Sequence, residues 1–402
     1  MFIELHIIQN FAPSNLNRSD TGSPKDCEFG GVRRARVSSQ CFKRVMRDYF
    51  KADPLFATAH RDKLATRTKR LLDTVVAMLG EKGRDETEAR RVVENALNGV
   101  KLTLKEDDKT QYLLFLGQQE IAAIADSCER YFTDLLGVAL PEAESQGEQT
   151  RARRGSARDT KRAGKDAVPK EIRDAFEKAL NGGKAADLAL FGRMLADLPQ
   201  KSIDAAAQVA HAISTHKTGV EFDFYTAVDD MPREDTEGAD MLGTVEFNSA
   251  CFYRYTNVDI GQLQKNLDND AELTRATIEA FIRAAIAAIP TGKQNSMAAQ
   301  NPPSFVLAVV RESELWSLAN AFVKPVRSTT ENDVVETSIR RLDEYWKQLT
   351  TAYGDEQIRE KAYINLSGED LPNLNGARVD GVKKLIETIS AAVTCQPEVQ
   401  TR

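Results

Sequence analysis

Hydrophobic and polar positions alternate along residues 221–230, EFDFYTAVDD, and again along residues 244–258, TVEFNSACFYRYTNV. Alternation with a period of two predicts strands, and two such strands around an acidic turn predict a long hairpin. Continuous apolar runs at residues 2–9, FIELHIIQ, and 305–310, FVLAVV, predict two further strands that are buried in a sheet. Residues 273–289 show helical spacing instead, and a proline ends that helix.

A second helix is predicted to begin near the middle of the first hundred residues. Either Ser38 or Ser39 can cap its first turn. The apolar residues Phe42, Val45 and Met46 then follow at the spacing of one helical stripe. When the long segment after this helix is set aside, the order of elements is β-α-β-β-α-β. This is the succession of a ferredoxin-like (RRM-like) domain of the α+β class.

The segment set aside, residues 56–185, is predicted to be a large helical insertion. Residues 62–136 show helical periodicity and no convincing strand. Residues 141–170 are polar and rich in turn residues, and they contain the basic run RARRGSARDTKRAGK at 151–165. Such a run is typical of a solvated loop, and a contact to RNA is the second interpretation.

Composition narrows the class of protein. Of 402 residues, 42% are hydrophobic and 28% are charged, as in an ordinary soluble globular protein. No segment approaches the roughly 20 apolar residues of a membrane span, and the N-terminus lacks a secretory leader, so we expect a cytoplasmic protein. The five cysteines and four histidines are scattered without metal-ligand spacing, and no Walker or GxSxG motif is present. We therefore expect no metal, no cofactor and no catalytic site.

Charge is unevenly distributed along the chain. Residues 1–178 contain 32 Lys and Arg against 28 Asp and Glu, whereas the whole chain has a net charge of -6. Basic side chains concentrate in residues 29–50, FGGVRRARVSSQCFKRVMRDYF. On a strand, Arg34 and Arg36 would point to the same side and could reach one partner.

The helix that follows adds a second basic face. Lys43 and Arg47 lie four residues apart, with Arg44 beside them. Neither candidate capping serine has Glu or Gln three positions later, so the N–H groups of the first turn stay open to an outside acceptor. Two interpretations are compatible with this pattern: the basic side chains bind phosphate groups, or they form a face that is simply solvated.

Two aspartates precede the basic strand. Asp20 and Asp26 could in principle polarise an RNA 2′-hydroxyl, although solvated turn residues are the more ordinary interpretation. The aromatic signature of RNA-recognition modules is missing, so base stacking on the sheet itself is not predicted.

Four stretches of the sequence resemble one known family, the CasC-type backbone subunit of Cascade, the type I-E CRISPR surveillance complex. They are LNRSDTGSPKDCEFGGVRRARVSSQCFKRVMR at 16–47, ALFGRM at 189–194, AHAISTHKTGVEFDFYTAVDD at 210–230 and LGTVEFNSACFYRYTNV at 242–258. The resemblance implies a ferredoxin-like palm, helical fingers formed by the insertion and a hairpin thumb. The implied ranges are 1–55, 186–217 and 249–402 for the palm, 56–185 for the fingers and 218–248 for the thumb.

The same resemblance implies an RNA-binding role for particular residues. Those implied to grip phosphates are Arg18, Lys25, Ser38, Gln40, Lys43, Arg44 and Arg47, to which the strand pattern adds Arg34 and Arg36. Met194 is implied to pack against a base. Phe224 and Tyr225, on the thumb, are implied to insert as a wedge at a position where a nucleotide is displaced. They stand where Trp-Phe is expected in a close relative, and both positions remain aromatic.

The function predicted first is a non-catalytic scaffold that polymerises along a CRISPR RNA and presents the guide bases to target DNA. The implied partners are CRISPR RNA, target DNA through the guide, further copies of the chain and other Cascade subunits, with no membrane, in the cytoplasm of a prokaryote. The alternative is a backbone subunit that cleaves target RNA through a loop aspartate, as type III complexes do. A free-standing RNA-recognition protein, monomeric with one RNA site, is the third hypothesis.

Overall fold

The computed structural model describes residues 1–105, 107–138, 167–227 and 241–394. The predicted basic run and the acidic turn of the hairpin lie outside these described residues. The chain divides into two compact units. The sheet unit comprises residues 1–55, 207–261 and 275–402, and the helical unit comprises residues 56–206 and 262–274.

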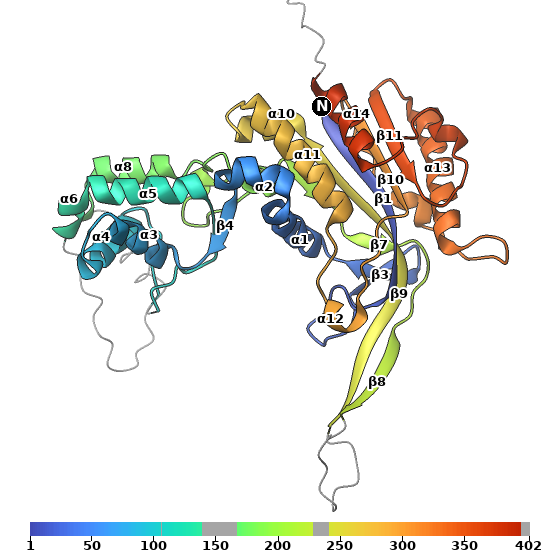
Figure 1. Cartoon of the computed structure of the whole chain (residues 1–402), viewed down its shortest axis with the longest axis horizontal. Helices are drawn as coiled ribbons and strands as arrows, with labels where there is room; N and C mark the ends of the chain where they lie inside the picture. The colour runs from blue at the N-terminus through green and yellow to red at the C-terminus, as the bar shows by residue number, and fades with distance from the viewer. Residues whose placement is uncertain (106, 139–166, 228–240, 395–402) are drawn as a thin grey trace, which may run out of the picture. The chain divides into compact units, whose positions relative to one another are not determined.

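The sheet unit is built on one antiparallel sheet (Figure 1). Its strands are β1 Phe2–Ser14, β2 Asp26–Phe29, β3 Val32–Val37, β6 Ala207–Val209, β7 Ala212–Ser214, β8 Glu221–Ala227, β9 Met241–Asp259, β10 Phe305–Arg311 and β11 Ile358–Asn365. The order along the sheet is β11, β10, β1, β9, β7, β3 and β2, and both β6 and β8 pair with β9. Ile3 of β1 lies opposite Val258 of β9 and Val310 of β10. The first predicted strand therefore lies between the last two, inside the sheet.

Helices pack on both faces of this sheet. They are α1 Ser39–Ala52, α11 Ala271–Ala287, α12 Gln294–Met297, α13 Val334–Tyr353 and α14 Val382–Thr394, with 3-10 turns at Leu318–Phe322 and Pro372–Leu374. On one face, Tyr253 of β9 shares a core with Trp346 of α13. On the other face, the Arg254 guanidinium lies 4.2 Å from the centre of the Phe42 ring in α1 and donates to the Ala285 carbonyl in α11. Consecutive residues of β9 thus face opposite layers, as strand geometry requires.

The predicted hairpin projects beyond the rest of its sheet (Figure 1). Its register runs from Glu221 opposite Phe247 to Ala227 opposite Met241. Every residue from Glu221 to Thr226 is exposed, so neither face of β8 is covered by the described part of the sheet unit. An uncovered two-stranded ribbon gains little from burial, and its apolar side chains remain available to a partner.

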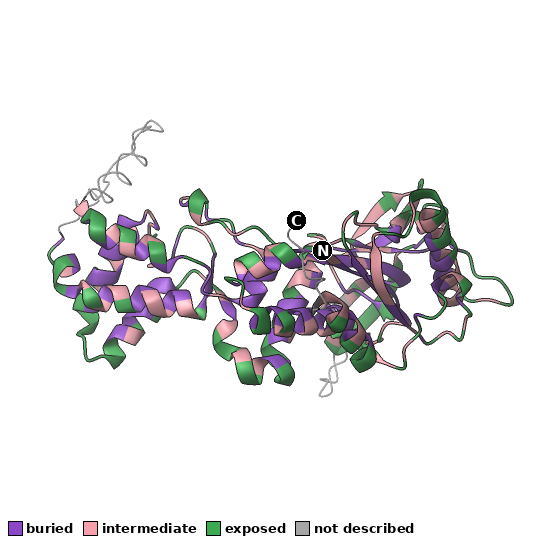
Figure 2. Cartoon of the chain, turned by 90° about the horizontal axis from the view of Figure 1, so that it is seen from above, coloured by how far each residue is buried: buried purple, intermediate pink, exposed green. Residues whose placement is uncertain are grey.

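The helical unit has a core of its own. Its elements are α2 Pro54–His60, a 3-10 turn Arg61–Lys63, β4 Ala65–Thr68, α3 Leu71–Glu81, α4 Glu86–Gly99, β5 Leu114–Gly117, α5 Gln118–Arg130, α6 Phe132–Leu136, α8 Lys170–Ala179, α9 Ala186–Phe191, a 3-10 turn Pro199–Lys201 and α10 Ile260–Asn266. Leu72, Val93 and Ile124 lie in one apolar cluster to which α3, α4, α5, α6 and α8 all contribute. Figure 2 shows buried and exposed positions alternating along these helices, which is the pattern of amphipathic helices around a shared core.

The expectation that this segment lacks strands is wrong. β4 and β5 pair as a two-stranded antiparallel sheet, with Ala65 opposite Gly117 and Thr68 opposite Leu114. Each strand has four residues, which is too short for a period of two to stand out from helical spacing.

The division into units also differs from the predicted palm limits. Residues 186–206, which the sequence placed in the palm, lie in the helical unit. The reason is the burial of α9 against β4: the Asp187 carboxylate accepts the N–H of Ala65 at 2.7 Å. The N–H of Ala206 then donates to the Ala189 carbonyl, which keeps the following segment in the same unit.

Candidate nucleic-acid interface

A loop at residues 15–25 leads into β2, the partner of the basic strand β3, and hydrogen bonds fix the shape of this loop. The N–H of Ser19 donates to the Ser23 carbonyl at 2.8 Å, which closes the turn. The Asn17 side chain accepts the N–H of Ser38 at 2.8 Å. The loop is therefore joined to the start of α1, which keeps the backbone of the predicted site residues in the loop close to that of the residues in the helix.

The start of α1 is capped by its own serine. Ser38 has an extended backbone, and its Oγ accepts the N–H of Cys41 at 3.3 Å. Ser38 is buried, so its hydroxyl serves the helix and the prediction that it contacts phosphate is not supported. Neither serine has Glu or Gln three positions later, but the N–H groups of the first turn are not all open to a ligand as predicted, because the Ser38 hydroxyl accepts one of them.

A pocket of about 460 Å³ opens between this loop and α1. It is lined by Leu16, Asn17, Arg18, Ser19, Asp20, Gly22, Cys41, Arg44, Val45, Thr291 and Gly292. Arg18 and Asp20 are exposed, and their side chains make no hydrogen bond or ion pair within the part of the chain that the structure describes. Arg44 makes a long 3.9 Å ion pair with Asp48 and keeps 77% of its side chain exposed. The pocket thus presents two guanidinium groups and one carboxylate.

One wall of the pocket comes from a segment far along the chain, at Thr291 and Gly292. A Cβ atom at Gly292 would collide with the carbonyl oxygens of Asn15 and Leu16, so only glycine allows this close approach. Lys293 follows with a φ of 53°, in the left-handed region that few residues with a side chain adopt. Sequence reasoning missed this wall, and its signal was a Gly-Lys pair in the loop after a proline.

The other predicted phosphate contacts on the helix and the loop differ in exposure. Gln40 is exposed, and Lys25 and Lys43 are partly exposed. Arg47 is only 5% exposed because it lies on the side of α1 that also buries Phe50. The role of Arg47 as a phosphate contact therefore stays a prediction, although little of its side chain is open to solvent.

Arg34 is the clearest correction to the predicted site. Its side chain is fully buried, and its guanidinium donates five hydrogen bonds to backbone carbonyl groups. The acceptors, at 2.7 to 3.2 Å, are Phe29, Ser214, Thr215, Phe322 and Val323. Alternation along the strand does place Arg34 and Arg36 on one side, but distant segments cover that side at Arg34. This arginine joins parts of the fold and is not available to RNA.

Arg36 remains partly exposed near the surface of the sheet. It donates to the Asp26 carbonyl at 3.0 Å and to Nδ1 of His211 at 3.1 Å. Burial, and then the positive charges of Arg36 and Lys25, lower the pKa of His211, so a neutral imidazole accepts this hydrogen bond near pH 7. The Asp26 carboxylate forms a 2.7 Å ion pair with Arg33. Of the two loop aspartates, Asp26 is thus already paired.

Within the described ranges, no group of three or more His, Cys, Asp or Glu side chains is placed to hold a metal ion. No helix in those ranges is long and apolar enough to cross a membrane.

Met194 is 82% exposed, and a buried ion pair fixes the backbone beside it. Nη1 of Arg193 lies 2.8 Å from both carboxylate oxygens of Glu120, and the two side chains are 1% and 0% exposed. Gly192 has a φ of 73°, and a Cβ atom there would lie 2.8 Å from the Ile203 carbonyl oxygen. A methionine held out on such a rigid support suits an apolar contact with a partner.

The hairpin presents its aromatic side chains unequally. Phe222 and Phe224 are 68% and 65% exposed and lie on one face, two residues apart. Tyr225 is on the other face and 43% exposed, and its ring lies so close to Gly243 on β9 that a Cβ atom there would collide with it. Tyr225 therefore stabilises the hairpin, whereas the phenylalanines face outward. Sequence reasoning did not single out the exposed Phe222, although its alternation with Phe224 was the signal.

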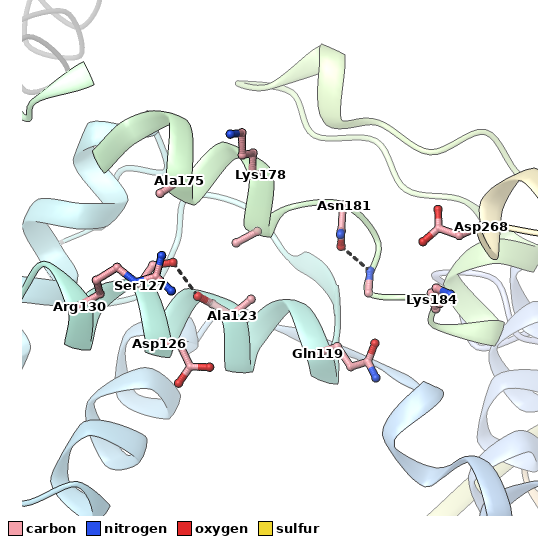
Figure 3. Close-up of a pocket in the computed structure, with 12 residues that line it drawn as sticks. Gln119, Ala123, Asp126, Ser127, Arg130, Ala175, Lys178, Asn181, Lys184 and Asp268 are labelled. Atoms are coloured by element: carbon pink, nitrogen blue, oxygen red, sulfur yellow. Dashed lines mark hydrogen bonds between the residues drawn. The ribbon is translucent and has the colours of Figure 1, made fainter. Parts of the chain in front are cut away.

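A second pocket, of about 410 Å³, lies on the helical unit. Figure 3 shows its lining residues on α5, on α8 and on the loop that follows α8. Its charges are mixed, because Lys184 lies 3.9 Å from Asp270, and Asp126 pairs with Lys82 at 2.7 Å. The lining carries three cations, Arg130, Lys178 and Lys184, against two carboxylates, Asp126 and Asp268, so it is far from the strongly basic patch that marks a nucleic-acid site.

Solved structures with this fold come from RNA-guided complexes. A chain of a "CRISPR RNA-guided surveillance complex, pre-nicking" matches with a TM-score of 0.79 and 29% identity, over 98% of this chain and 100% of that one. A chain of a "CRISPR RNA-guided surveillance complex" matches over the same shares with a TM-score of 0.73 and 25% identity. No curated protein matches the sequence.

A family model described as "CT1975-like protein" matches residues 3–391. The match spans nearly the whole sequence, so the chain belongs to the CT1975-like protein family. Together with the two structural matches, it confirms the resemblance to a CasC-like, Cascade-type subunit that the four sequence stretches indicated.

Proposed function

We propose that this chain is a non-catalytic backbone subunit that binds a CRISPR RNA, assembles in several copies along it and presents the guide bases to target DNA. The similar solved chains belong to complexes described as CRISPR RNA-guided. The observation that carries the proposal is the pocket that Arg18 from the loop and Arg44 from α1 line together. Paired guanidinium groups in a pocket suit the phosphates of a nucleic acid backbone.

The arrangement of the sheet supports a ferredoxin-like palm. Within the sheet unit, β1, α1, β7, β9, α11 and β10 occur in the chain order β-α-β-β-α-β, and their strands are neighbours in the sheet in the order β10, β1, β9 and β7. The helical unit is inserted after α1, β2 and β3 lie between β1 and α1, and β8 lies between β7 and β9. We assign the helical unit to the fingers and the hairpin of β8 and β9 to the thumb.

In this proposal the protein contacts phosphate and leaves base identity to pairing. Arg18 and Arg44 bind backbone phosphates at the pocket, Gln40 and Lys43 extend the contact along the first turns of α1, and Lys25 extends it at the end of the loop. Phosphate contacts set position and affinity but carry no sequence information. One surface can therefore hold any guide, which suits an RNA-guided scaffold.

Replacing Arg18 or Arg44 with alanine is expected to weaken RNA binding by the same factor for unrelated guide sequences. Each lost phosphate contact should also reduce the slope of log affinity against log salt concentration by about 0.7. Fluorescence anisotropy at several salt concentrations measures both quantities. Arg33→Ala is the matched control, because Arg33 is exposed, paired with Asp26 and outside the pocket. An effect on one guide sequence alone, or an unchanged slope, would contradict the phosphate assignment.

For the thumb we assign the wedge to Phe224, supported by Phe222 on the same face, and an anchoring role to Tyr225. Stacking between an aromatic ring and a base contributes roughly 1 to 3 kcal/mol. Phe224→Ala is expected to keep the melting temperature and most of the salt-dependent RNA affinity, but to weaken regular assembly or target-DNA capture. Tyr225→Ala is expected to loosen the hairpin itself, because it uncovers Gly243.

Electron microscopy of the assembled ribonucleoprotein and gel-shift assays with target DNA test the wedge on the same preparations. Glu221→Ala, an exposed change on the same strand, controls for general effects on the hairpin. A folded Phe224→Ala protein with normal assembly and normal DNA capture would remove the wedge from the proposal.

A further inference from the structure

The pocket between the loop and α1 contains a carboxylate that a site for phosphate alone would not need. Asp20 lines it together with Arg18 and Arg44. Like charges repel, so a carboxylate beside a bound phosphate lowers affinity unless it meets a different group of the ligand. Asp20 makes no direct hydrogen bond or ion pair among the described residues, so its carboxylate oxygens are open to a donor on the ligand.

Several of the other polar groups that line the pocket are already engaged within the loop. The hydroxyl of Ser19 lies 2.8 Å from the Thr21 hydroxyl and 3.2 Å from the Ser23 carbonyl oxygen. The Asn17 side-chain oxygen accepts the N–H of Ser38. The charged groups left to a ligand are therefore two arginines, which only donate hydrogen bonds, and one aspartate, which when ionised only accepts them.

We propose that Asp20 accepts a hydrogen bond from a ribose 2′-hydroxyl while Arg18 and Arg44 bind the flanking phosphates, so that the pocket selects RNA over DNA. The 2′-hydroxyl is the donor that distinguishes the two backbones. A volume of about 460 Å³ lies within the roughly 300 to 1,000 Å³ of small-ligand pockets, which suits a sugar with its phosphates. This inference rests on the proposed RNA binding and names the chemical group that the site recognises.

The loop fixes the backbone that carries this carboxylate. The side-chain amide of Asn15 donates to the carbonyls of Gly22 and Glu246 at 2.9 Å, which ties the end of the turn to β9. The N–H of Gly22 donates to Ser19 at 3.1 Å, so Asp20 lies inside a closed turn. A carboxylate on a fixed backbone has few positions to sample, which helps it to discriminate between ligands that have and lack a donor.

The test measures affinity ratios on the full-length protein. Fluorescence anisotropy is recorded with an RNA guide, with DNA of the same sequence and with RNA that carries 2′-fluoro in place of every 2′-hydroxyl. We expect the wild-type protein to prefer RNA to both others, because fluorine cannot donate a hydrogen bond. Asp20→Ala should reduce the ratio of RNA to DNA affinity about ten-fold or more, the range of a hydrogen bond to a charged group. Asp20→Asn, whose amide oxygen still accepts, should give an intermediate ratio.

Two controls separate this effect from a loss of fold or of charge. Arg18→Ala should lower RNA and DNA affinity alike and leave their ratio unchanged, because phosphate is common to both. Glu28→Ala removes an exposed acidic residue from β2, outside the pocket, and should change neither affinity by more than about two-fold. Circular dichroism melting of every variant shows whether the fold is retained.

The outcomes distinguish the two proposals. Absence of RNA binding by the wild-type protein would overturn the proposed function and this inference with it. An RNA preference that survives Asp20→Ala unchanged would overturn the inference alone. RNA cleavage with Mg²⁺ that Asp20→Ala abolishes would give the carboxylate a catalytic role and also overturn it. A reduced ratio in a folded Asp20→Ala protein, with intact RNA, supports it.

Discussion

Arg34→Ala is expected to lower the free energy of unfolding of the sheet unit by about 3 to 5 kcal/mol, among the largest effects of a single substitution. The guanidinium joins three segments of the fold, because it donates to the backbone of Phe29, of Ser214 and of Phe322. The side chain is fully buried, so water cannot replace these donors without opening the structure. Each buried polar group left without a partner costs about 1 to 3 kcal/mol. Denaturant titration followed by circular dichroism measures the change.

Arg33→Ala is the matched control for this prediction. Arg33 is the neighbouring residue on the same strand, its side chain is 67% exposed, and its ion pair with Asp26 lies at the surface. Its removal should change stability by no more than about 1 kcal/mol. Arg34→Lys keeps the charge but has three donors in place of five, so it should be intermediate. An Arg34→Ala protein that has wild-type stability and reduced RNA affinity would restore the phosphate role that the sequence suggested.

Periodicity predicted the central elements well, because residues that recur with the period of a helix or a strand lie on one face of it and share one environment. All seven residues of β10 are buried, which explains the continuous apolar run that predicted this strand. The stripe of Phe42, Val45 and Met46 is buried on α1 as helical spacing requires. Local pattern and tertiary packing agree at these positions, so the sequence alone was sufficient.

The candidate site was harder to predict, since its form depends on segments far apart in the sequence. The cover over Arg34 includes Phe322, 288 positions away, and no local pattern on β3 shows which face it will bury. The pocket likewise needs Gly292 against the loop at residues 15–25. Strand alternation could place Arg34 and Arg36 on one side, but it could not distinguish a covered side from an open one.

Arg193→Met is the second large effect that we expect, and it concerns the helical unit. The substitution should lower the free energy of unfolding by about 3 to 5 kcal/mol, because it leaves the Glu120 carboxylate buried without its partner charge. Glu120 is 0% exposed and would keep two hydrogen bonds, from the N–H groups of Gly117 at 2.8 Å and Gly182 at 2.6 Å. Two backbone donors stabilise an anion, but they do not replace a guanidinium held 2.8 Å from both of its oxygens.

A double-mutant cycle separates the charge from the packing. The double variant Glu120→Gln with Arg193→Met carries no buried charge, so it should lose less stability than Arg193→Met alone, even though it contains one more substitution. Arg90→Ala is the control at a partly exposed ion pair. Arg90 lies 2.6 Å from Asp108 and 3.5 Å from Asp73, its side chain is 34% exposed, and its removal should cost no more than about 1 kcal/mol. If the single and double variants lost equal stability, the buried charge would not be the cause. Arg193 would then act through packing and through its hydrogen bonds to the carbonyls of Phe115 and Lys201, and its charge would not be needed to support Met194.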